Sequence, residues 1–99
     1  MAANLIIAPE AVADLDEAYS WYEAQRIGRG DDFLIRVDAC IQGILRMPEM
    51  HTRFHQNYRR ALVRKYPFAI FYEYTEDAVT VYSVFHTSQD PKKWRQRLP

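Results

Sequence analysis

The chain has 99 residues, 48% hydrophobic and 14% aromatic, which suffices for one small domain with its own core. Its formal net charge of zero by itself predicts neither a nucleic-acid binder nor an acidic solubility domain, and its single cysteine excludes an internal disulfide and suits a reducing compartment. The first residues lack the charged start and long apolar run of a signal peptide, and no segment approaches the length of a membrane span. We therefore expect a cytoplasmic protein.

The charges are unevenly distributed along the chain. Residues 1–57 contain nine acidic residues and five Lys or Arg, whereas residues 58–99 contain eight Lys or Arg and four acidic residues. Such an asymmetry can create a basic face on a protein that is neutral overall.

The first half of the sequence predicts a strand followed by a helix. Residues 4–8 form a short apolar run that stops at Pro9, and Pro9 suits the first position of a helix that runs to about Arg26. Trp21 lies off the centre of the apolar stripe of this helix. The stripe has spacings of three and four and consists of Val12, Leu15, Tyr19 and Tyr22.

A second helix follows the break at Gly28-Arg29-Gly30, with Asp31 or Asp32 as its expected cap. It ends near Met47 because Pro48 disfavours helical backbone at the residue before it. The segment from Pro48 to Asn57 shows no period and is expected to be a loop. The broad apolar face of this helix comprises Phe33, Leu34, Val37, Cys40, Ile41, Ile44 and Leu45, so Cys40 is expected to be a core residue rather than a nucleophile.

The second half predicts three strands and a final helix. The strands are expected at residues 58–65, 68–74 and 79–86, and the last two are joined by a polar turn at residues 75–78. A short helix from Pro91 to Arg97 follows, with Ser88 or Asp90 as its cap.

These elements predict an α+β fold in a single domain over residues 1–99. We expect a twisted antiparallel sheet that contains the opening strand and a three-stranded meander. The helical hairpin covers one face of this sheet, and the short C-terminal helix closes the fold.

The order of the elements and several short motifs resemble the RelE/ParE superfamily of toxins from bacterial type II toxin-antitoxin systems. The resemblance covers nearly the whole chain. The motifs are Ile7-Ala8-Pro9-Glu10-Ala11 with Asp14-Leu15, Pro48 after the second helix, Ile70-Phe71-Tyr72, and His86-Thr87-Ser88-Gln89-Asp90-Pro91 with Trp94 and Arg97. The resemblance implies a growth-arresting toxin that forms a hetero-oligomer with a cognate antitoxin, acts on DNA gyrase or the ribosome, and needs no cofactor and no membrane.

The superfamily holds two activities with different residue requirements. RelE-like members resemble ribosome-dependent mRNA endoribonucleases, in which basic residues on the sheet stabilise the charge that develops on the phosphate. ParE-like members resemble inhibitors that bind DNA gyrase without a catalytic group. This chain keeps Arg59 at a matching position but has Ala61, Ala69 and either His86 or Thr87 where the nucleases carry basic residues. These departures favour the ParE-like, gyrase-binding activity.

The basic residues of the second half are candidate contacts with the target or the antitoxin. They comprise Arg59, Arg60, Arg64 and Lys65 on the predicted strand and Lys92, Lys93, Arg95 and Arg97 in the tail, together with Trp94. The alternative interpretation of the strand charges is that they protect a sheet edge from aggregation.

Two alternative functions remain open, a nuclease and a decayed toxin. In a nuclease, Arg59 and Arg64 would hold the phosphate and His86 would be the general base, whereas the structural alternative is that His86 bonds to backbone or to Asp90 at the strand end. A decayed toxin would keep only its antitoxin binding.

Metal binding has little support in the sequence. His51 and His55 are four residues apart, but Pro48 just upstream indicates a loop, and no acidic residue completes a zinc motif. No metal site is therefore predicted.

Overall fold

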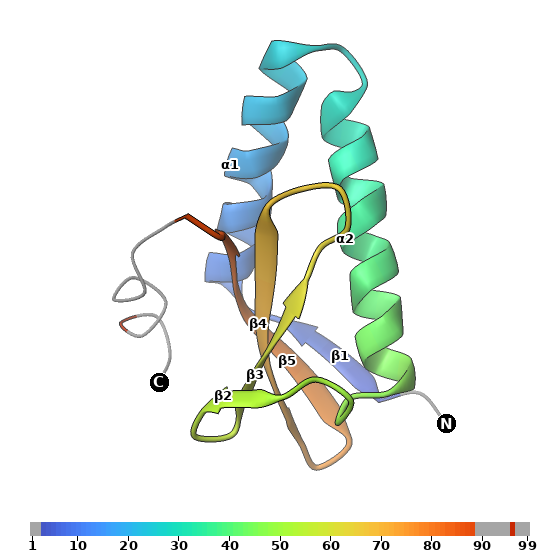
Figure 1. Ribbon diagram of the computed structural model, residues 1–99, viewed down its shortest axis with the longest axis vertical. Coiled ribbons are helices and arrows are strands. Elements are labelled where there is room, and N and C mark those ends of the chain that lie inside the picture. The colour runs from blue at the N-terminus through green and yellow to red at the C-terminus, as the bar shows by residue number, and fades with distance from the viewer. Residues whose placement is uncertain (1–2, 89–95, 97–99) are drawn as a thin grey trace.

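The computed structural model describes residues 3–88 and Gln96, and in these residues two helices pack against a five-stranded sheet (Figure 1). The expected C-terminal helix from Pro91 to Arg97 lies outside the described residues except for Gln96. In chain order the elements are β1 (Asn4–Ile7), α1 (Pro9–Gln25), α2 (Arg29–Arg46), β2 (Arg53–His55), β3 (Tyr58–Leu62), β4 (Phe68–Thr75) and β5 (Ala78–His86).

The sheet is mixed, whereas a purely antiparallel sheet was expected. Its strand order is β1-β5-β4-β3-β2, and β1 runs parallel to β5 while all other neighbours are antiparallel. The direction of β1 depends on a partner more than seventy residues later in the chain, so no local pattern encodes it. The predicted α+β class and helical hairpin are confirmed.

The loop expected between Pro48 and Asn57 contains a strand, so that expectation is wrong. β2 pairs with β3 through Arg53 opposite Arg59 and His55 opposite Tyr58, and Gln56 adopts a left-handed conformation with φ 51° in the connecting turn. Three residues are too few to display an alternating pattern. Because β2 lies outside β3, β3 is not the edge strand that its charges suggested.

The β4–β5 hairpin forms as predicted. Its two turn residues, Glu76 and Asp77, both have positive φ values, 51° and 61°, as a tight turn of type I′ requires. The preceding strand, β3, is shorter than predicted and ends at Leu62 instead of Lys65. Lys65 itself has φ 75°, a left-handed conformation that a regular strand does not contain.

Helix α1 buries smaller side chains than its predicted apolar stripe suggested. Its buried residues are Ala11, Ala18 and Tyr22, whereas Val12, predicted to belong to the buried stripe, is 45% exposed. Trp21 is 64% exposed, which confirms that it lies outside the stripe.

Helix α2 begins earlier than predicted and is capped from α1. Gly28, with φ 89°, precedes its first residue, so the expected capping by Asp31 or Asp32 is wrong. The Glu23 carboxylate of α1 instead accepts the backbone N–H groups of Gly28 and Gly30 at 3.0–3.1 Å. An acidic group at the N-terminus of a helix also complements its dipole.

The two faces of the sheet carry separate apolar clusters. The larger cluster lies under the helices and includes Phe33, Ile44, Ile70, Tyr72 and Val79. The smaller cluster, on the opposite face, contains Ala69, Phe71 and Phe85, with Phe54 of β2 packed against it. Burial on both faces explains why successive residues of β4 and β5, which point to opposite faces, are both apolar.

Asp14 of α1 completes the hydrogen bonding of β5 beyond the end of β1. The pairing of β1 with β5 stops near Val81, and farther along β5 the Asp14 Oδ2 atom accepts the backbone N–H of Val84 at 3.0 Å. Val84 is 2% exposed, so without Asp14 this N–H would lie in a largely dry environment.

We therefore expect Asp14→Ala to lower the free energy of unfolding by about 1–3 kcal/mol, the cost of an unpaired buried N–H. Urea denaturation measures this difference. Asp16→Ala is the matched control, because Asp16 is an exposed acid on the same helix. Equal effects of the two substitutions would contradict the role assigned to Asp14.

Candidate functional site

The basic residues of β3 lie on opposite faces of the sheet. Arg59 is opposite Tyr72 on the side of the helices, and its guanidinium donates to the backbone carbonyls of Glu49, at 3.1 Å, and His51. Arg60 is opposite Phe71 on the other face and is exposed. Side-chain alternation along the strand separates the two, so they do not form one binding surface.

Arg59 and Tyr72 together fix the segment that links α2 to β2. Tyr72 is fully buried and its hydroxyl donates to the carbonyl of Pro48 at 2.9 Å. Burial raises the pKa of Tyr72 to about 12, so the hydroxyl stays protonated and able to donate. Side chains of β3 and β4 thus bind three backbone carbonyls within four residues of a loop that has no regular structure of its own.

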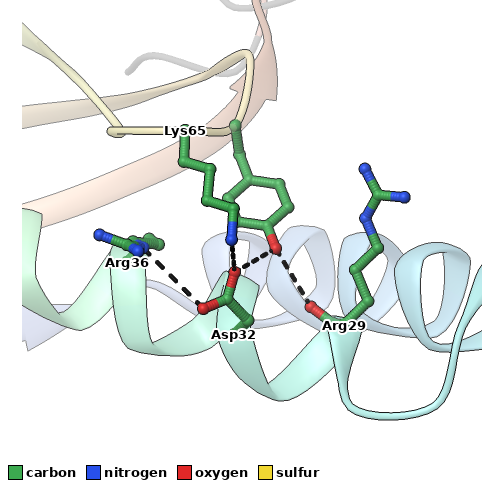
Figure 2. Close-up of polar contacts among 5 residues, drawn as sticks. Arg29, Asp32, Arg36 and Lys65 are labelled. Atoms are coloured by element: carbon green, nitrogen blue, oxygen red, sulfur yellow. Dashed lines mark hydrogen bonds and ion pairs between the residues drawn. The ribbon is translucent and has the colours of Figure 1, made fainter.

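Lys65 is engaged by α2 (Figure 2). Its Nζ lies 2.8 Å from Asp32 Oδ2, which also accepts the hydroxyl of Tyr66 at 2.6 Å, and Arg36 Nε lies 3.9 Å from Asp32 Oδ1. The hydrogen bonds from Lys65 and then Tyr66 lower the pKa of Asp32, against a smaller opposing effect of burial. Arg64, its neighbour in the turn, is exposed. The charge of Lys65 is therefore largely compensated within the molecule, unlike that of Arg64.

His86 lies at the end of β5, opposite Phe68, and its ring centroid is 5.3 Å from that of Phe68. Its Nδ1 accepts the backbone N–H of Ser88 at 3.1 Å and lies 2.7 Å from Ser88 Oγ. This is the backbone bond expected of a structural histidine. Asp90, the other expected partner, lies outside the described residues.

His86 also lines a groove of about 1230 Å³ between α1 and the end of β5, called here the α1–β5 groove. Glu10, Asp14 and Glu17 of α1 contribute to one side, and Trp21 lies farther along the same helix. Phe68, Tyr82 and Phe85 contribute aromatic surface. The sequence did not predict this groove. The signal was present in the spacing of three and four residues between Glu10, Asp14 and Glu17, which places them on one helix face.

The three nuclease candidates are not brought together. Arg59 is level with Tyr72 on β4, whereas His86 is level with Phe68, four residues along the same strand. At about 3.4 Å per residue this offset alone is about 14 Å. Arg64 follows β3 near the His86 end of the sheet but is exposed in a turn. With the Arg59 guanidinium bound to the carbonyls of Glu49 and His51, one phosphate group does not contact both Arg59 and His86 in this structure.

The remaining sequence candidates have defined places. The His51 ring packs edge-on against Tyr72 and the His55 ring stacks on Tyr58, and within the described part of the chain no three potential metal ligands cluster. Cys40 Sγ donates to the carbonyl of Leu62 at 3.6 Å, and burial raises the pKa of its thiol to about 11. The tail candidates Lys92, Lys93, Trp94, Arg95 and Arg97 lie outside the described residues.

The helices are also too short or too polar to cross a lipid bilayer. This finding covers α1, α2 and any other helical segment in the part of the chain that the structure describes.

Comparisons with known proteins agree with this architecture. The family model described as "ParE toxin of type II toxin-antitoxin system, parDE" matches residues 5–91. A structure of the chromosomal ParDE toxin-antitoxin system of P. aeruginosa has a TM-score of 0.78 at 12% identity, covering 87% of this chain and 97% of that one. No match was found among curated proteins.

Two RelE structures share the fold at similarly low identity. The isolated E. coli RelE toxin has a TM-score of 0.63 at 14% identity, covering 96% of this chain and 95% of that one. RelB-RelE of Methanococcus jannaschii, an antitoxin-toxin complex, has a TM-score of 0.51 at 18% identity, covering 95% of this chain and 99% of that one. At these identities the structural likenesses demonstrate the fold alone.

The position of Arg59 leads to a prediction that separates structure from catalysis. Arg59→Ala is expected to lower the free energy of unfolding by about 2 kcal/mol, because it removes charged hydrogen bonds to loop carbonyls. Arg60→Ala, the adjacent change on the opposite face, should alter it by less than about 0.5 kcal/mol. Chemical denaturation of both variants provides the measurement, and a larger effect of Arg60→Ala would refute the assignment.

The Asp32 contacts predict a pH dependence. Because the folded-state pKa of Asp32 lies below its usual value, its ionised form stabilises the protein above the unfolded-state pKa, and this contribution is lost as the pH falls through the folded-state pKa. The melting temperature of Asp32→Asn should therefore lie below that of the wild type near pH 7, and the gap should narrow below about pH 4. Asp38→Asn, an exposed change on the same helix, should show no such gap. A gap that persists unchanged into acid would count against the ionic contact.

Proposed function

The chain belongs to the ParE toxin family of type II toxin-antitoxin systems, and from this premise we propose that it arrests growth by binding DNA gyrase. We further propose that a cognate antitoxin binds and neutralises it. The P. aeruginosa neighbour is itself part of a ParDE toxin-antitoxin system, and the M. jannaschii neighbour is a complex of RelE with its antitoxin RelB.

The observation that carries the choice of binding over mRNA cleavage is the dispersal of the candidate nuclease residues. Arg59 binds loop carbonyls on the helix side of the sheet, and His86 lies about 14 Å farther along the strand direction with its Nδ1 beside Ser88. General acid-base cleavage of RNA requires these groups within hydrogen-bond reach of one phosphate and its neighbouring hydroxyl. A binding activity makes no such demand.

The proposed contact surface for the target combines exposed cations of the second half of the chain. Arg60 and Arg64 are exposed on and beside β3, while Arg59 and Lys65 have partners within the molecule. The proposed contact surface also includes the tail residues Lys92, Lys93, Trp94, Arg95 and Arg97. Exposed cations favour association with an acidic or nucleic-acid-bearing target by accelerating the encounter.

The decisive experiment is induction of the chain in a bacterial host without antitoxin, with pulse labelling of DNA and protein synthesis over minutes. Early loss of DNA synthesis, together with loss of supercoiling by purified gyrase when the chain is added, would support gyrase binding. Early loss of translation with cleaved mRNA would overturn it in favour of a RelE-like nuclease. Absence of both effects, with the folded chain accumulating, would indicate a decayed toxin.

Two variants test the contact surface. A chain truncated before Lys92 should lose most of its growth arrest, because it lacks the basic tail, whereas His86→Ala should retain it. Colony counts after induction measure both effects, and circular dichroism with antitoxin binding confirms that each variant is folded. Full toxicity of the truncated chain would rule out the tail as a contact, and loss of toxicity in a folded His86→Ala variant would favour catalysis.

A further inference from the structure

The β1 edge of the sheet lacks two features that usually protect an edge strand, charged residues and a β-bulge. β1 has β5 as its only strand neighbour among the described residues, and Figure 1 shows it at one margin of the sheet. The segment Asn4–Ala8 contains no charged residue, and Leu5 and Ile6 are 39% and 52% exposed. Proteins commonly protect such edges with charges, bulges or very short strands.

The opposite edge is protected in that way. β2 has only three residues, begins with the exposed Arg53, and changes register between Arg53 and His55. β1 is also short, with four residues, but its uncharged edge and regular register leave its outward backbone groups open to pairing.

The register with β5 identifies which backbone groups of β1 point outward. The N–H of Asn4 donates to Asp77 and that of Ala8 donates to Val81, so Asn4, Ile6 and Ala8 direct their backbone groups toward β5. The intervening residues Leu5 and Ile7 direct their N–H and C=O groups away from the sheet. The next outward position is Pro9, which has no N–H and ends the edge available for pairing.

We propose that β1 pairs with β1 of a second copy of this chain, antiparallel about a two-fold axis at Ile6. Leu5 of each copy then lies opposite Ile7 of the other, and the pair exchanges four backbone hydrogen bonds. Ile6 faces Ile6 across the axis as a non-hydrogen-bonded pair, in which the side chains are closest. The two sheets become one continuous sheet.

A second copy fits this edge better than a charged partner segment. Antiparallel two-fold pairing is self-complementary, since the same two residues supply donors and acceptors on both sides. The apolar Ile6 side chain, exposed in the monomer, becomes covered by its own counterpart. The absence of charge near the axis means that no like charges are brought together.

Charge substitution at the axis tests the pairing. Wild-type protein should show a concentration-dependent shift from 11.7 kDa toward twice that mass in sedimentation equilibrium. Ile6→Lys should abolish the shift, and an equimolar mixture of Ile6→Lys with Ile6→Glu should restore it. Ile27→Lys is the matched control, because Ile27 is 91% exposed but lies in the turn after α1. This control should behave as the wild type.

Disulfide trapping tests the register. In a Cys40→Ser background, Ile6→Cys should form a disulfide-linked dimer under mild oxidation, because non-hydrogen-bonded pairs have Cα atoms about 4.5 Å apart, within the range of disulfides. Leu5→Cys in the same background should cross-link far less, because the Leu5 residues of the two copies do not face each other. The experiment uses the full chain and does not depend on the gyrase proposal.

Two results would overturn the proposal. One is a wild-type chain that remains a single 11.7-kDa species up to about 1 mM, where even weak pairing is populated. The other is a dimer that persists in Ile6→Lys or cross-links equally through both cysteine positions, since either would place the interface elsewhere.

Discussion

β5 is the strand on which the rest of the structure depends. One edge of β5 forms the long antiparallel ladder with β4, and the other edge is shared between β1 and the Asp14 side chain of α1. The register shift opposite Phe71 and Tyr72 inserts one extra residue into β5. A bulge of this kind changes which residues face outward, and it thereby presents Val84 to Asp14. Strand and helix thus satisfy successive parts of one edge.

The same packing decides which charges remain available for a partner. The second half of the chain is rich in Lys and Arg, yet Arg59 and Lys65 are used to hold the α2–β2 loop and the β3–β4 turn in place. The number of Lys and Arg residues in this half therefore overstates the basic surface of the sheet. The acids behave in the same way, since Glu23 caps α2, Asp14 completes β5 and Asp32 binds Lys65. Arg60 and Arg64 remain exposed on and beside β3, and the α1–β5 groove remains open between α1 and the end of β5.

Sequence patterns predicted the elements whose signals are local. The two helices have apolar residues at helical spacing, and the β4–β5 hairpin has two long apolar runs around a short polar turn, so all three were found. The parallel direction of β1, the capping of α2 by Glu23 and the engagement of Arg59 depend on partners brought together only by folding. Arg59 shows why the candidate site could not be predicted fully. An arginine at this position suits phosphate binding as well as a structural role, and only the folded chain places the carbonyls of Glu49 and His51 beside it.

The energetics of the β1 edge explain why its pairing would be weak and conditional. Four exchanged backbone hydrogen bonds at about 1 kcal/mol each give a net gain of about 4 kcal/mol, to which covering Ile6 adds about 1–2 kcal/mol. Loss of translational and rotational freedom opposes this gain, so the pairing is weak and depends on the concentration of the chain. Any factor that raises the local concentration of copies therefore strengthens this pairing. An antitoxin oligomer that held two toxin chains would do so, because tethering converts the second contact into an intramolecular event.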